Sequence, residues 1–395
     1  MTGDFFTYQA QTTPQPLAMK VSFAKGSYIY DDKGIPHLDF VAGVSACSLG
    51  HCHPSVISAV ERQLKQYMHV MVYGEYIQEP AVAFTKLLAQ HIPAPLEKTY
   101  LVNSGTEAIE GALKLARRAT GRSQIIAMHH AYHGNTMGSL SIMGYERRKS
   151  VFRPLLPDVR FIRFNSIPDL ELISNRTAAV IIETIQGGAG FIIPGTEYMA
   201  ALRQKCSEAG ALLIVDEIQP GFGRTGTLFG FQHYDIIPDI ICMGKGMGGG
   251  LPVGAFTASA TLMNLLQHTP ELGHITTFGG NPVIAAASLA VLETLTSTTL
   301  MADTLLKETY LRQRLRHPLI QEIRGKGLML ALILPSEEIA NQLVLRCKEA
   351  RLILFWLLFE KRAVRITPPL ITTETELEEG CSIILRILDS IYTEI

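Results

Sequence analysis

Residues 178–217 decide the fold class of this chain, because Ala178-Ala-Val-Ile-Ile-Glu183 and Ala211-Leu-Leu-Ile-Val-Asp-Glu217 are two nearly continuous apolar runs. Such runs are typical of strands that are buried on both faces. We predict a helix between them from Tyr198 to Ala209, and Gly210 is expected to end it. A strand, a helix and a second strand in this order predict a parallel sheet covered by helices.

The same alternation extends along the chain in both directions. A helix is predicted over Glu107–Ala116, with Ser104 or Thr106 as its cap. Four further strands are predicted, at Leu101–Asn103, Gln124–Met128, Asp239–Met243 and Val253–Thr257. We therefore expect an α/β protein whose large domain is built around a mostly parallel central sheet.

The two ends of the chain differ from its middle. Lys25–Asp39 is predicted as a meander of short strands, and the apolar run Leu352–Phe359 as one buried strand. The sequence thus predicts a large domain over residues 51–285. A smaller α+β domain is predicted from both termini, residues 1–50 and 286–395.

Composition excludes several classes of protein. Hydrophobic residues make up 47% and charged residues 18% of 395 residues, which excludes bulk disorder. The net charge of −1 leaves no basic surplus, so no nucleic-acid partner is expected. No apolar run reaches the roughly 18 residues of a membrane helix, so no membrane partner is expected. The N-terminus shows no secretory signal and the six cysteines are scattered, so we expect a cytoplasmic location.

Polar residues stand at three predicted strand ends, where ligands of open α/β sheets bind. Ser104, Gly105 and Thr106 lie between a strand and a helix. Exposed N–H groups, the positive helix end and two hydroxyls predict an anion cradle there. An ordinary capped turn explains the same residues.

The other two strand ends carry Asp216 and Lys245. A carboxylate at the tip of a buried strand either binds a cationic group of a ligand or forms a structural ion pair, with Arg224 as the candidate partner. Lys245 stands among glycines, which either let the backbone approach a ligand or leave the lysine solvated in a flexible loop. The pattern of a nucleotide-binding P-loop is absent from this segment.

One ligand satisfies all three strand ends. It carries a phosphate for the cradle, a cationic ring nitrogen for the carboxylate and a carbonyl for the lysine. Pyridoxal 5′-phosphate has these three groups: its aldehyde forms a Schiff base with lysine, and a carboxylate keeps its pyridine nitrogen protonated. We therefore expect pyridoxal 5′-phosphate as the cofactor.

Motifs spread over nearly the whole chain resemble those of the class III (ω-amino-acid) aminotransferases, which are fold type I pyridoxal-phosphate enzymes. Each motif is weak alone, but together they follow the family's order. They are Gly50-His-Cys-His-Pro54, Asn103-Ser-Gly-Thr-Glu107, Ala131-Tyr-His-Gly134, Val215-Asp-Glu-Ile-Gln219, Gly223-Arg-Thr-Gly226, Gly244-Lys-Gly246, Gly249-Gly-Leu-Pro-Val-Gly254, Thr276-Thr-Phe-Gly-Gly-Asn-Pro282 and Arg365-Ile-Thr-Pro-Pro369.

The resemblance implies roles for single residues. Lys245 is similar to the Schiff-base lysine, which also moves the substrate proton, and Asp216 is similar to the partner of the pyridinium. Thr277 resembles a threonine that completes the phosphate cradle from the neighbouring subunit, which implies a homodimer with shared active sites. The remaining cofactor-binding set is Ser104, Gly105 and Thr106 at the phosphate, Tyr132 and Ile218 on the ring faces, Gln219 at the ring 3-oxygen, and His133 and Glu183.

No metal site is expected. Five histidines, His51, His53, His129, His130 and His133, are assigned to turns and packing, because no second ligand pair with metal-site spacing accompanies them.

Two departures from the family concern the substrate. Arg365 resembles the arginine that binds a substrate carboxylate, but Gly188 stands where many members have a glutamate that gates it. Asn135 stands where those members often have an arginine for the distal carboxylate. Losing that charge-assisted contact costs on the order of 1.5–3 kcal/mol.

The expected activity is ping-pong transfer of an amino group from an ω-amino acid or amine, of the acetylornithine, ornithine or 4-aminobutyrate kind, to a 2-oxo acid. Asn135 favours a small acceptor such as pyruvate; 2-oxoglutarate stays open because another basic residue could replace the missing one. Loops around Val44 and Tyr73–Glu75 are expected to form pocket walls. The alternatives are an aminomutase or decarboxylase on the same scaffold, or a protein that binds the cofactor for regulation.

Overall fold

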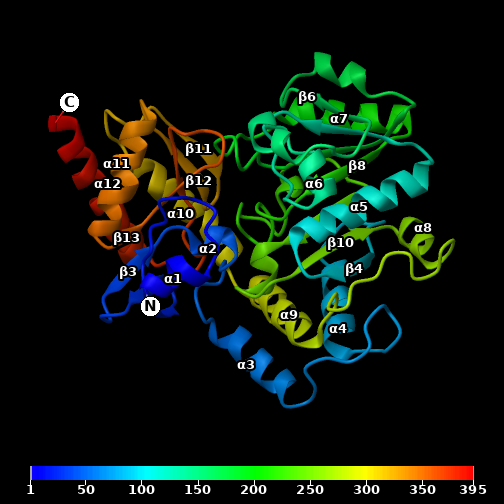
Figure 1. Ribbon diagram of the computed structural model, residues 1–395, viewed down its shortest axis with the longest axis horizontal. Coiled ribbons are helices and arrows are strands. Elements are labelled where there is room, and N and C mark those ends of the chain that lie inside the picture. The colour runs from blue at the N-terminus through cyan, green and yellow to red at the C-terminus, as the bar shows by residue number, and fades with distance from the viewer. Residues whose placement is uncertain (1, 395) are drawn as a thin grey trace.

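The computed structural model describes residues 2–394 and shows two lobes, with the N- and C-termini in the same lobe (Figure 1). The other lobe contains a seven-stranded sheet of order β4-β10-β9-β8-β7-β5-β6. Its strands are β4 (Lys98–Val102), β5 (Gln124–Met128), β6 (Val159–Ile162), β7 (Thr177–Glu183), β8 (Leu212–Asp216), β9 (Ile240–Gly244) and β10 (Gly254–Ala258).

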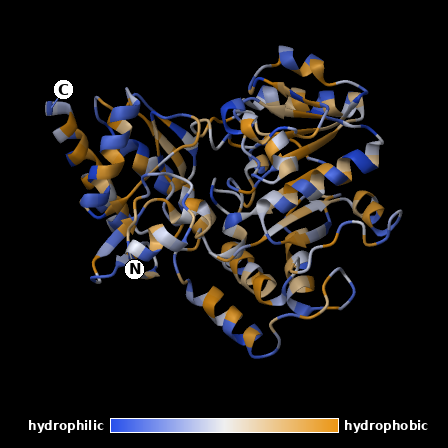
Figure 2. Cartoon of the chain, viewed as in Figure 1, coloured by the Kyte–Doolittle hydropathy of each residue, from blue (hydrophilic) through white to orange (hydrophobic). Residues whose placement is uncertain are grey.

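This sheet is mostly parallel, as predicted. Only β10 runs against its neighbours: it pairs antiparallel with both β4 and β9, whereas β6, β5, β7, β8 and β9 pair in parallel. Every residue of β7 and β9 is buried, which explains their unbroken apolar sequences. Figure 2 shows these central strands as predominantly hydrophobic.

Helices cover both faces of the sheet. Of the two predicted cap residues, Ser104 is the N-cap of α5 (Gly105–Thr120), and its hydroxyl accepts a hydrogen bond from the backbone N–H of Glu107. α7 (Thr196–Ala209) ends at Gly210, whose φ of 63° suits glycine. The other helices of this region are α3 (Pro54–Leu64), α4 (Glu79–Ala89), α6 (Met137–Ser141), α8 (Ala260–Met263) and α9 (Pro282–Ser297).

α9 packs against α3 and α4 below the sheet, and α10 (Leu300–Arg314) follows it after a sharp bend. Within residues 2–394 no single helix is long and apolar enough to cross a membrane; α9 and α10 reach that length and composition only as a pair bent by 70°. Short 3-10 helices complete the connections: η1 (Glu146–Arg148), η2 (Ser150–Phe152), η3 (Pro168–Leu172), η4 (Gly230–His233), η5 (Lys245–Gly248) and η6 (Asn264–Gln267).

The second lobe combines both ends of the chain in two four-stranded sheets, β1-β2-β3-β13 and β11-β12-β15-β14. β3 pairs in parallel with β13, so that Leu38 lies opposite Leu352. The predicted domain boundaries near residues 51 and 285 stay a prediction. The elements are β1 (Val21–Lys25), β2 (Tyr28–Asp31), β3 (Pro36–Asp39), β11 (Glu322–Lys326), β12 (Met329–Ile333), β13 (Leu352–Ile353), β14 (Phe355–Trp356), β15 (Ala363–Ile366), α1 (Thr2–Tyr8), α2 (Ala42–Ser45), α11 (Glu337–Glu349) and α12 (Glu374–Glu394).

The prediction of one buried strand over Leu352–Phe359 is wrong. The run divides into β13, which joins the N-terminal sheet, and β14, which joins the other sheet of this lobe. Leu354 between them is buried, while Phe355 is 39% exposed. The run is apolar because it contacts two sheets in succession. A sequence of uniform hydrophobicity does not show at which residue the chain passes from one sheet to the other.

Candidate active site

The three strand ends singled out in the sequence meet at one edge of the central sheet. Ser104 follows β4, Asp216 is the last residue of β8, and Lys245 directly follows β9. β8 and β9 are parallel neighbours, and β4 runs in their direction because β10 is antiparallel to both β4 and β9. Their carboxyl ends therefore lie on the same side, where ligands of such sheets bind.

The segment Ser104–Thr106 forms the N-terminus of α5. A Cβ on Gly105 would lie 2.8 Å from Cδ1 of Ile218, so a side chain larger than hydrogen would push Ile218 out of place. The Thr106 hydroxyl lies 2.7 Å from Oγ of Ser139. The first N–H groups of a helix have no partner within the helix and favour an anion. Both the cap and the cradle are thus compatible with this turn.

Asp216 is paired with His133 rather than with an arginine. Its Oδ2 lies 2.7 Å from Nδ1 of His133, and both side chains are buried. Its Oδ1 accepts a hydrogen bond of 3.0 Å from the backbone N–H of Ile218. Nε2 of His133 is buried without a hydrogen-bond partner among the described residues. The pair fixes the direction in which the carboxylate points.

The ion pair between Asp216 and Arg224, left open by the sequence, does not form. Arg224 is fully buried and donates hydrogen bonds to the carbonyl of Leu328, at 3.1 Å, and to Oγ of Ser48, at 3.2 Å. Burial lowers the pKa of Arg224 to about 9. Its partners come from segments distant in sequence, which a local pattern could not indicate.

Glu183 ties the segment that carries Tyr132 to the end of β7. Its Oε1 accepts from the backbone N–H of Tyr132 at 3.0 Å, and its Oε2 accepts from that of Gly187 at 2.8 Å. Burial raises the pKa of Glu183 to about 7. Asn135 is exposed, and its amide donates to the Tyr132 hydroxyl at 3.1 Å.

Lys245 has a left-handed backbone conformation and a lowered pKa. Its φ is 45°, a left-handed value that costs a residue with a side chain roughly 1–2 kcal/mol. Such strain is concentrated at functional sites. Burial lowers the pKa of Lys245; the charge of Asp216 opposes this shift, and that of Arg365 adds to it. A lowered pKa increases the fraction of neutral, nucleophilic amine.

Arg365, in β15, is a buried cation that forms no ion pair with any of the residues described. Only 5% of it is exposed, and its Nε and Nη1 have no hydrogen-bond partner within residues 2–394. Its Cζ lies 6.0 Å from the ring centre of Phe191. Burial lowers the pKa of Arg365 to about 10, so the side chain stays cationic at neutral pH. Two unpaired guanidinium nitrogens in a buried place fit a carboxylate.

A left-handed turn that the sequence did not reveal lies beside this cluster. In α2, Ala42, Gly43, Val44 and Ser45 have φ values of 50°, 59°, 61° and 67°. Ser45 accepts a hydrogen bond of 3.4 Å from the amide of Gln219, and Val44 is 38% exposed. In the sequence, only Gly43 indicates a left-handed backbone here, and one glycine is not enough to predict a turn of four such residues.

Two predicted residues remain, Thr277 and Gly188. Thr277 is exposed in the loop that precedes α9. At Gly188, the carbonyl accepts from the backbone N–H of Phe359 at 2.9 Å, and a Cβ would lie 2.6 Å from the Phe359 ring. Sequence reasoning missed Phe359 because it belongs to the apolar run assigned to a buried strand.

These residues fit pyridoxal 5′-phosphate. The glycine-lined N-terminus of α5 suits a phosphate, the oriented carboxylate of Asp216 suits a protonated ring nitrogen, and the amine of Lys245 suits an aldehyde. Within residues 2–394, no group of three His, Cys, Asp or Glu side chains is arranged to hold a metal ion.

Comparisons with known proteins agree with this chemistry. The family model described as "Aminotransferase class-III" matches residues 8–388. An acetylornithine aminotransferase of Clostridium acetobutylicum is 37% identical, over 92% of this chain and 95% of that protein. One of Mycolicibacterium smegmatis is 39% identical, over 93% of this chain and 92% of that protein. The ornithine aminotransferase structure from Toxoplasma gondii superposes with a TM-score of 0.91 at 30% identity, covering 100% of this chain and 96% of that one.

The close superposition on an ornithine aminotransferase confirms the expected fold type I architecture. Accordingly, this chain belongs to the class III aminotransferases, and it is a transaminase that works with pyridoxal 5′-phosphate.

Proposed function

We propose that this transaminase takes its amino group from an ω-amino acid of the acetylornithine type and passes it to a 2-oxo acid. The observation that carries the proposal is the buried, unpaired guanidinium of Arg365, whose charge acts on Lys245. An α-carboxylate bound to Arg365 would hold the reacting carbon of a 2-oxo acid close to the lysine amine. Relatives named acetylornithine aminotransferase support the choice of donor.

Each residue has one task in this proposal. When bound, the cofactor withdraws electrons from the carbon that carries the transferred amino group. Asp216, held by His133, would orient its carboxylate toward the ring nitrogen. Lys245 is the base and acid that moves the proton on the reacting carbon, for which its lowered pKa suits it. Tyr132 and Ile218 are assigned to the ring faces, and Gln219 to the ring 3-oxygen.

The aminomutase and decarboxylase alternatives are not favoured by the family match. They also differ in a simple observable, because neither needs a 2-oxo acid to regenerate the enzyme. Transamination instead requires one amino donor and one acceptor per cycle, in two separate half-reactions.

The test is single-turnover kinetics on the holoenzyme. Loss of the cofactor's aldehyde absorption is followed with N-acetylornithine, ornithine, 4-aminobutyrate and β-alanine, and its return with 2-oxoglutarate and pyruvate. We expect the fastest loss with N-acetylornithine. Faster loss with 4-aminobutyrate or β-alanine than with N-acetylornithine would contradict the acetylornithine type, and turnover without any acceptor would contradict transamination.

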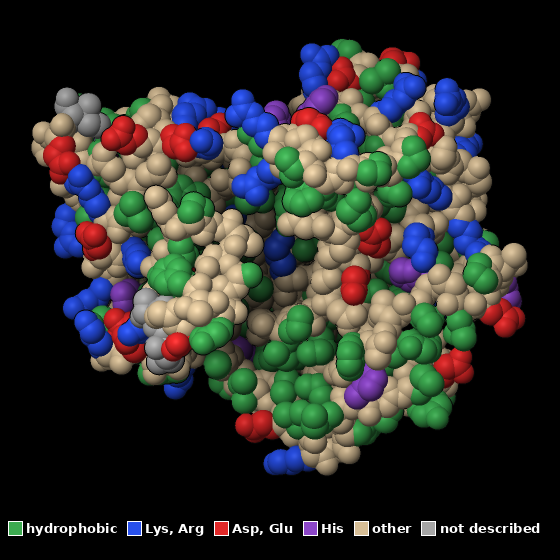
Figure 3. Space-filling model, viewed as in Figure 1, with side chains coloured by type: hydrophobic (Ala, Val, Ile, Leu, Met, Phe, Trp, Pro, Cys, Tyr) green, Lys and Arg blue, Asp and Glu red, His purple; other side chains and the backbone are tan. Residues whose placement is uncertain are grey.

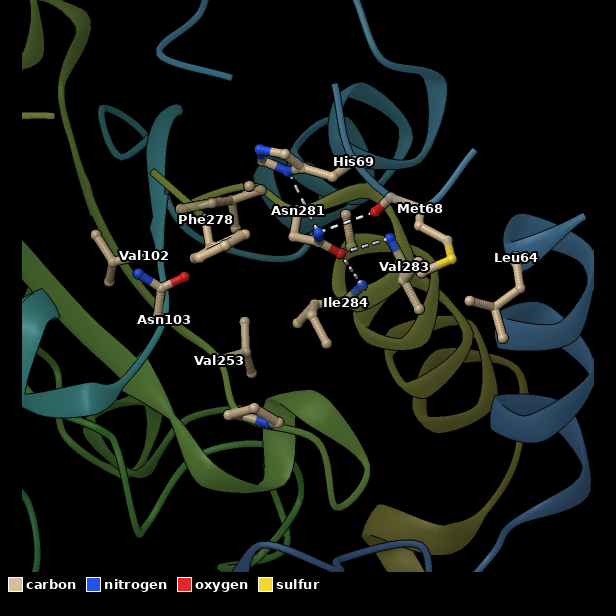
Figure 4. A pocket seen from close by; sticks show the side chains of 14 residues that line it. Leu64, Met68, His69, Val102, Asn103, Val253, Phe278, Asn281, Val283 and Ile284 are labelled. Atoms are coloured by element: carbon tan, nitrogen blue, oxygen red, sulfur yellow. Dashed lines mark hydrogen bonds between the residues drawn. The ribbon is translucent and has the colours of Figure 1, made fainter. Parts of the chain in front are cut away.

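We further propose that the protein is a homodimer, supported by an apolar surface that the chain leaves exposed. Figure 3 shows hydrophobic side chains gathered over the lower part of the sheet lobe. Phe278 is 58%, Met68 63% and Ile77 93% exposed. A pocket in this surface lies between α3, the segment after it and the start of α9, where Asn281 donates to the Met68 carbonyl (Figure 4). Thr277 is exposed next to Phe278, so the residue assigned to the partner's cradle belongs to this surface.

The dimer is tested by light scattering of Phe278→Glu beside Leu306→Glu. Leu306 is 70% exposed on α10 in the other lobe, so its variant is a matched control. We expect a monomer with little activity for the first variant and a fully active dimer for the second. A monomeric wild type would refute the proposal. The cytoplasmic location stays a prediction, which fractionation of the producing cells would test.

A further inference from the structure

One of the two departures from the family, Gly188, is matched by an aromatic ring. The Phe359 ring occupies the space into which a side chain at position 188 would extend, since a Cβ there would lie 2.6 Å from its Cε2. Glycine at 188 and phenylalanine at 359 are therefore complementary. The ring of Phe359 also stacks on Tyr145, with centroids 4.6 Å apart and planes inclined by 18°.

The guanidinium of Arg148 contacts one ring of this stack. Cζ of Arg148, in η1, lies 5.9 Å from the centre of the Phe359 ring, within the range of a cation–π contact. Arg148 follows Tyr145 by one turn, and its backbone N–H donates to the Tyr145 carbonyl at 3.1 Å. The guanidinium is thus positioned by the same ring that fills the place of a glutamate in other members of the family.

Arg148 is exposed and, within residues 2–394, has no carboxylate partner. The nearest acid in sequence, Glu146, is paired with Arg153 at 2.7 Å and lies 3.8 Å from Lys149. Lys149 is buried over the ring of Phe161, so it is unavailable to a ligand. Arg148 is left as a cation with free donors.

The positive charge of Arg148 acts on Tyr132, the residue assigned to one face of the cofactor ring. Burial raises the pKa of Tyr132, and the positive charge of Arg148 opposes that rise more than any other group. The Tyr132 hydroxyl accepts a hydrogen bond from Asn135. The Phe359 ring that Arg148 contacts lies against Gly188. A Cβ on the neighbouring Gly187 would lie 2.9 Å from Oε1 of Gln219, so Arg148 stands at the rim of the cofactor site.

We propose that Arg148 binds the distal carboxylate of a dicarboxylic 2-oxo acid such as 2-oxoglutarate, while Arg365 binds its α-carboxylate. The inference rests on the proposed function, in which Arg365 holds the acceptor. The guanidinium that is missing at position 135 is then supplied from η1. Arg148 is then a specificity residue for the acceptor and has no part in the donor's chemistry.

The test compares 2-oxoglutarate with pyruvate as acceptors for the pyridoxamine form of the wild type, Arg148→Gln, Arg148→Lys and Arg147→Gln. Arg147 is the neighbouring exposed arginine and gives a control of equal charge change. For Arg148→Gln we expect KM for 2-oxoglutarate to rise roughly 10- to 100-fold with kcat little changed. KM for pyruvate should stay the same, and Arg148→Lys should recover part of the loss.

A binding measurement gives a second readout. Calorimetric titration of the holoenzyme with glutarate and with butyrate compares ligands with and without the second carboxylate. Glutarate should lose its advantage in Arg148→Gln and keep it in Arg147→Gln. If the wild type prefers 2-oxoglutarate and binds glutarate better than butyrate, yet Arg148→Gln changes neither, the role of Arg148 is refuted while the proposed function stands. A wild type that reacts with pyruvate alone refutes the dicarboxylate acceptor, and a wild type that reacts with no 2-oxo acid refutes the proposed function itself.

Discussion

The cofactor half of the site (Ser104–Thr106, Asp216 and Lys245) and its substrate rim (Asn135, Arg148, Gly188 and Phe359) are built in different ways. The cofactor half stands on the ends of three strands of one sheet, with its carboxylate fixed by His133. The rim is formed by loops from both lobes, and its contacts are ring stacking and exposed charge. Backbone geometry sets the first, whereas side chains from distant segments set the second. The chemistry is thus constrained by the fold, and the choice of acceptor is open to change.

The largest effect expected is in the cofactor half. Lys245→Ala should lower kcat by at least roughly 1,000-fold, because the residue supplies both the nucleophile and the proton carrier. The melting temperature should stay close to that of the wild type, since alanine meets the same left-handed backbone at φ 45°. Steady-state kinetics and calorimetry check both points. Full turnover without Lys245 would end the assignment of its role.

Asp216→Asn tests the role of the carboxylate in the cofactor half. It removes the charge that faces His133 at 2.7 Å and should lower kcat roughly 100- to 1,000-fold, the usual worth of one oriented electrostatic group. KM for the donor should change much less. The measurement is kcat with saturating substrates, with His133→Asn as a companion that leaves the carboxylate in place but unoriented. Equal activity of Asp216→Asn and wild type would remove Asp216 from the mechanism.

The rim should respond more weakly and only toward one substrate. In Gly188→Ala the new methyl group displaces the Phe359 ring and loosens Arg148 above it. KM for 2-oxoglutarate should rise roughly 2- to 5-fold, the worth of an exposed cation–π contact, with pyruvate unaffected. Parallel KM determinations decide this. Equal losses with both acceptors would mean that the substitution disturbs the cofactor half instead.

The last effect expected is on stability and not on activity: it is a dependence on pH from Glu217, which directly follows Asp216. Its carboxylate is fully buried, accepts from the backbone N–H of Gly230 at 2.8 Å and of Phe231 at 2.7 Å, and has its pKa raised by burial to about 7. The folded state therefore binds this proton more tightly than the unfolded state, whose pKa is 4.5. Glu217 thus lowers the free energy of unfolding as pH rises from 4.5 to 7.

Glu217→Gln removes that dependence. The variant should be less stable at pH 5, because glutamine loses one acceptor, but the deficit should shrink by up to about 1.4 kcal/mol per pH unit toward pH 7. Urea unfolding of both proteins at pH 5, 6 and 7 measures the difference, in which groups common to both cancel. A deficit that is constant with pH would contradict the raised pKa.

The same contrast explains what the sequence could predict. The sequence predicts β7 and β8 because strands buried on both faces have unbroken apolar runs. The positions of the strand ends then predict which polar residues lie at the site. The pairing of Asp216 with His133, the left-handed turn at Ala42–Ser45 and the contact of Phe359 with Gly188 were not found. Each depends either on contacts between segments far apart in sequence or on backbone angles that the residue types at those positions do not indicate.

The parallel pairing of β3 with β13 has a consequence for synthesis of the protein. The ribosome releases residues 36–39 more than 300 residues before Leu352 and Ile353, their neighbours in the sheet. The seven-stranded sheet, complete at Ala258, is available to fold long before this happens. Until β13 is made, the edge of β3 in the N-terminal meander therefore stays unpaired. An unpaired strand edge is a site for binding by chaperones or by a second nascent chain. In this molecule the first segment made is among the last to reach its final place.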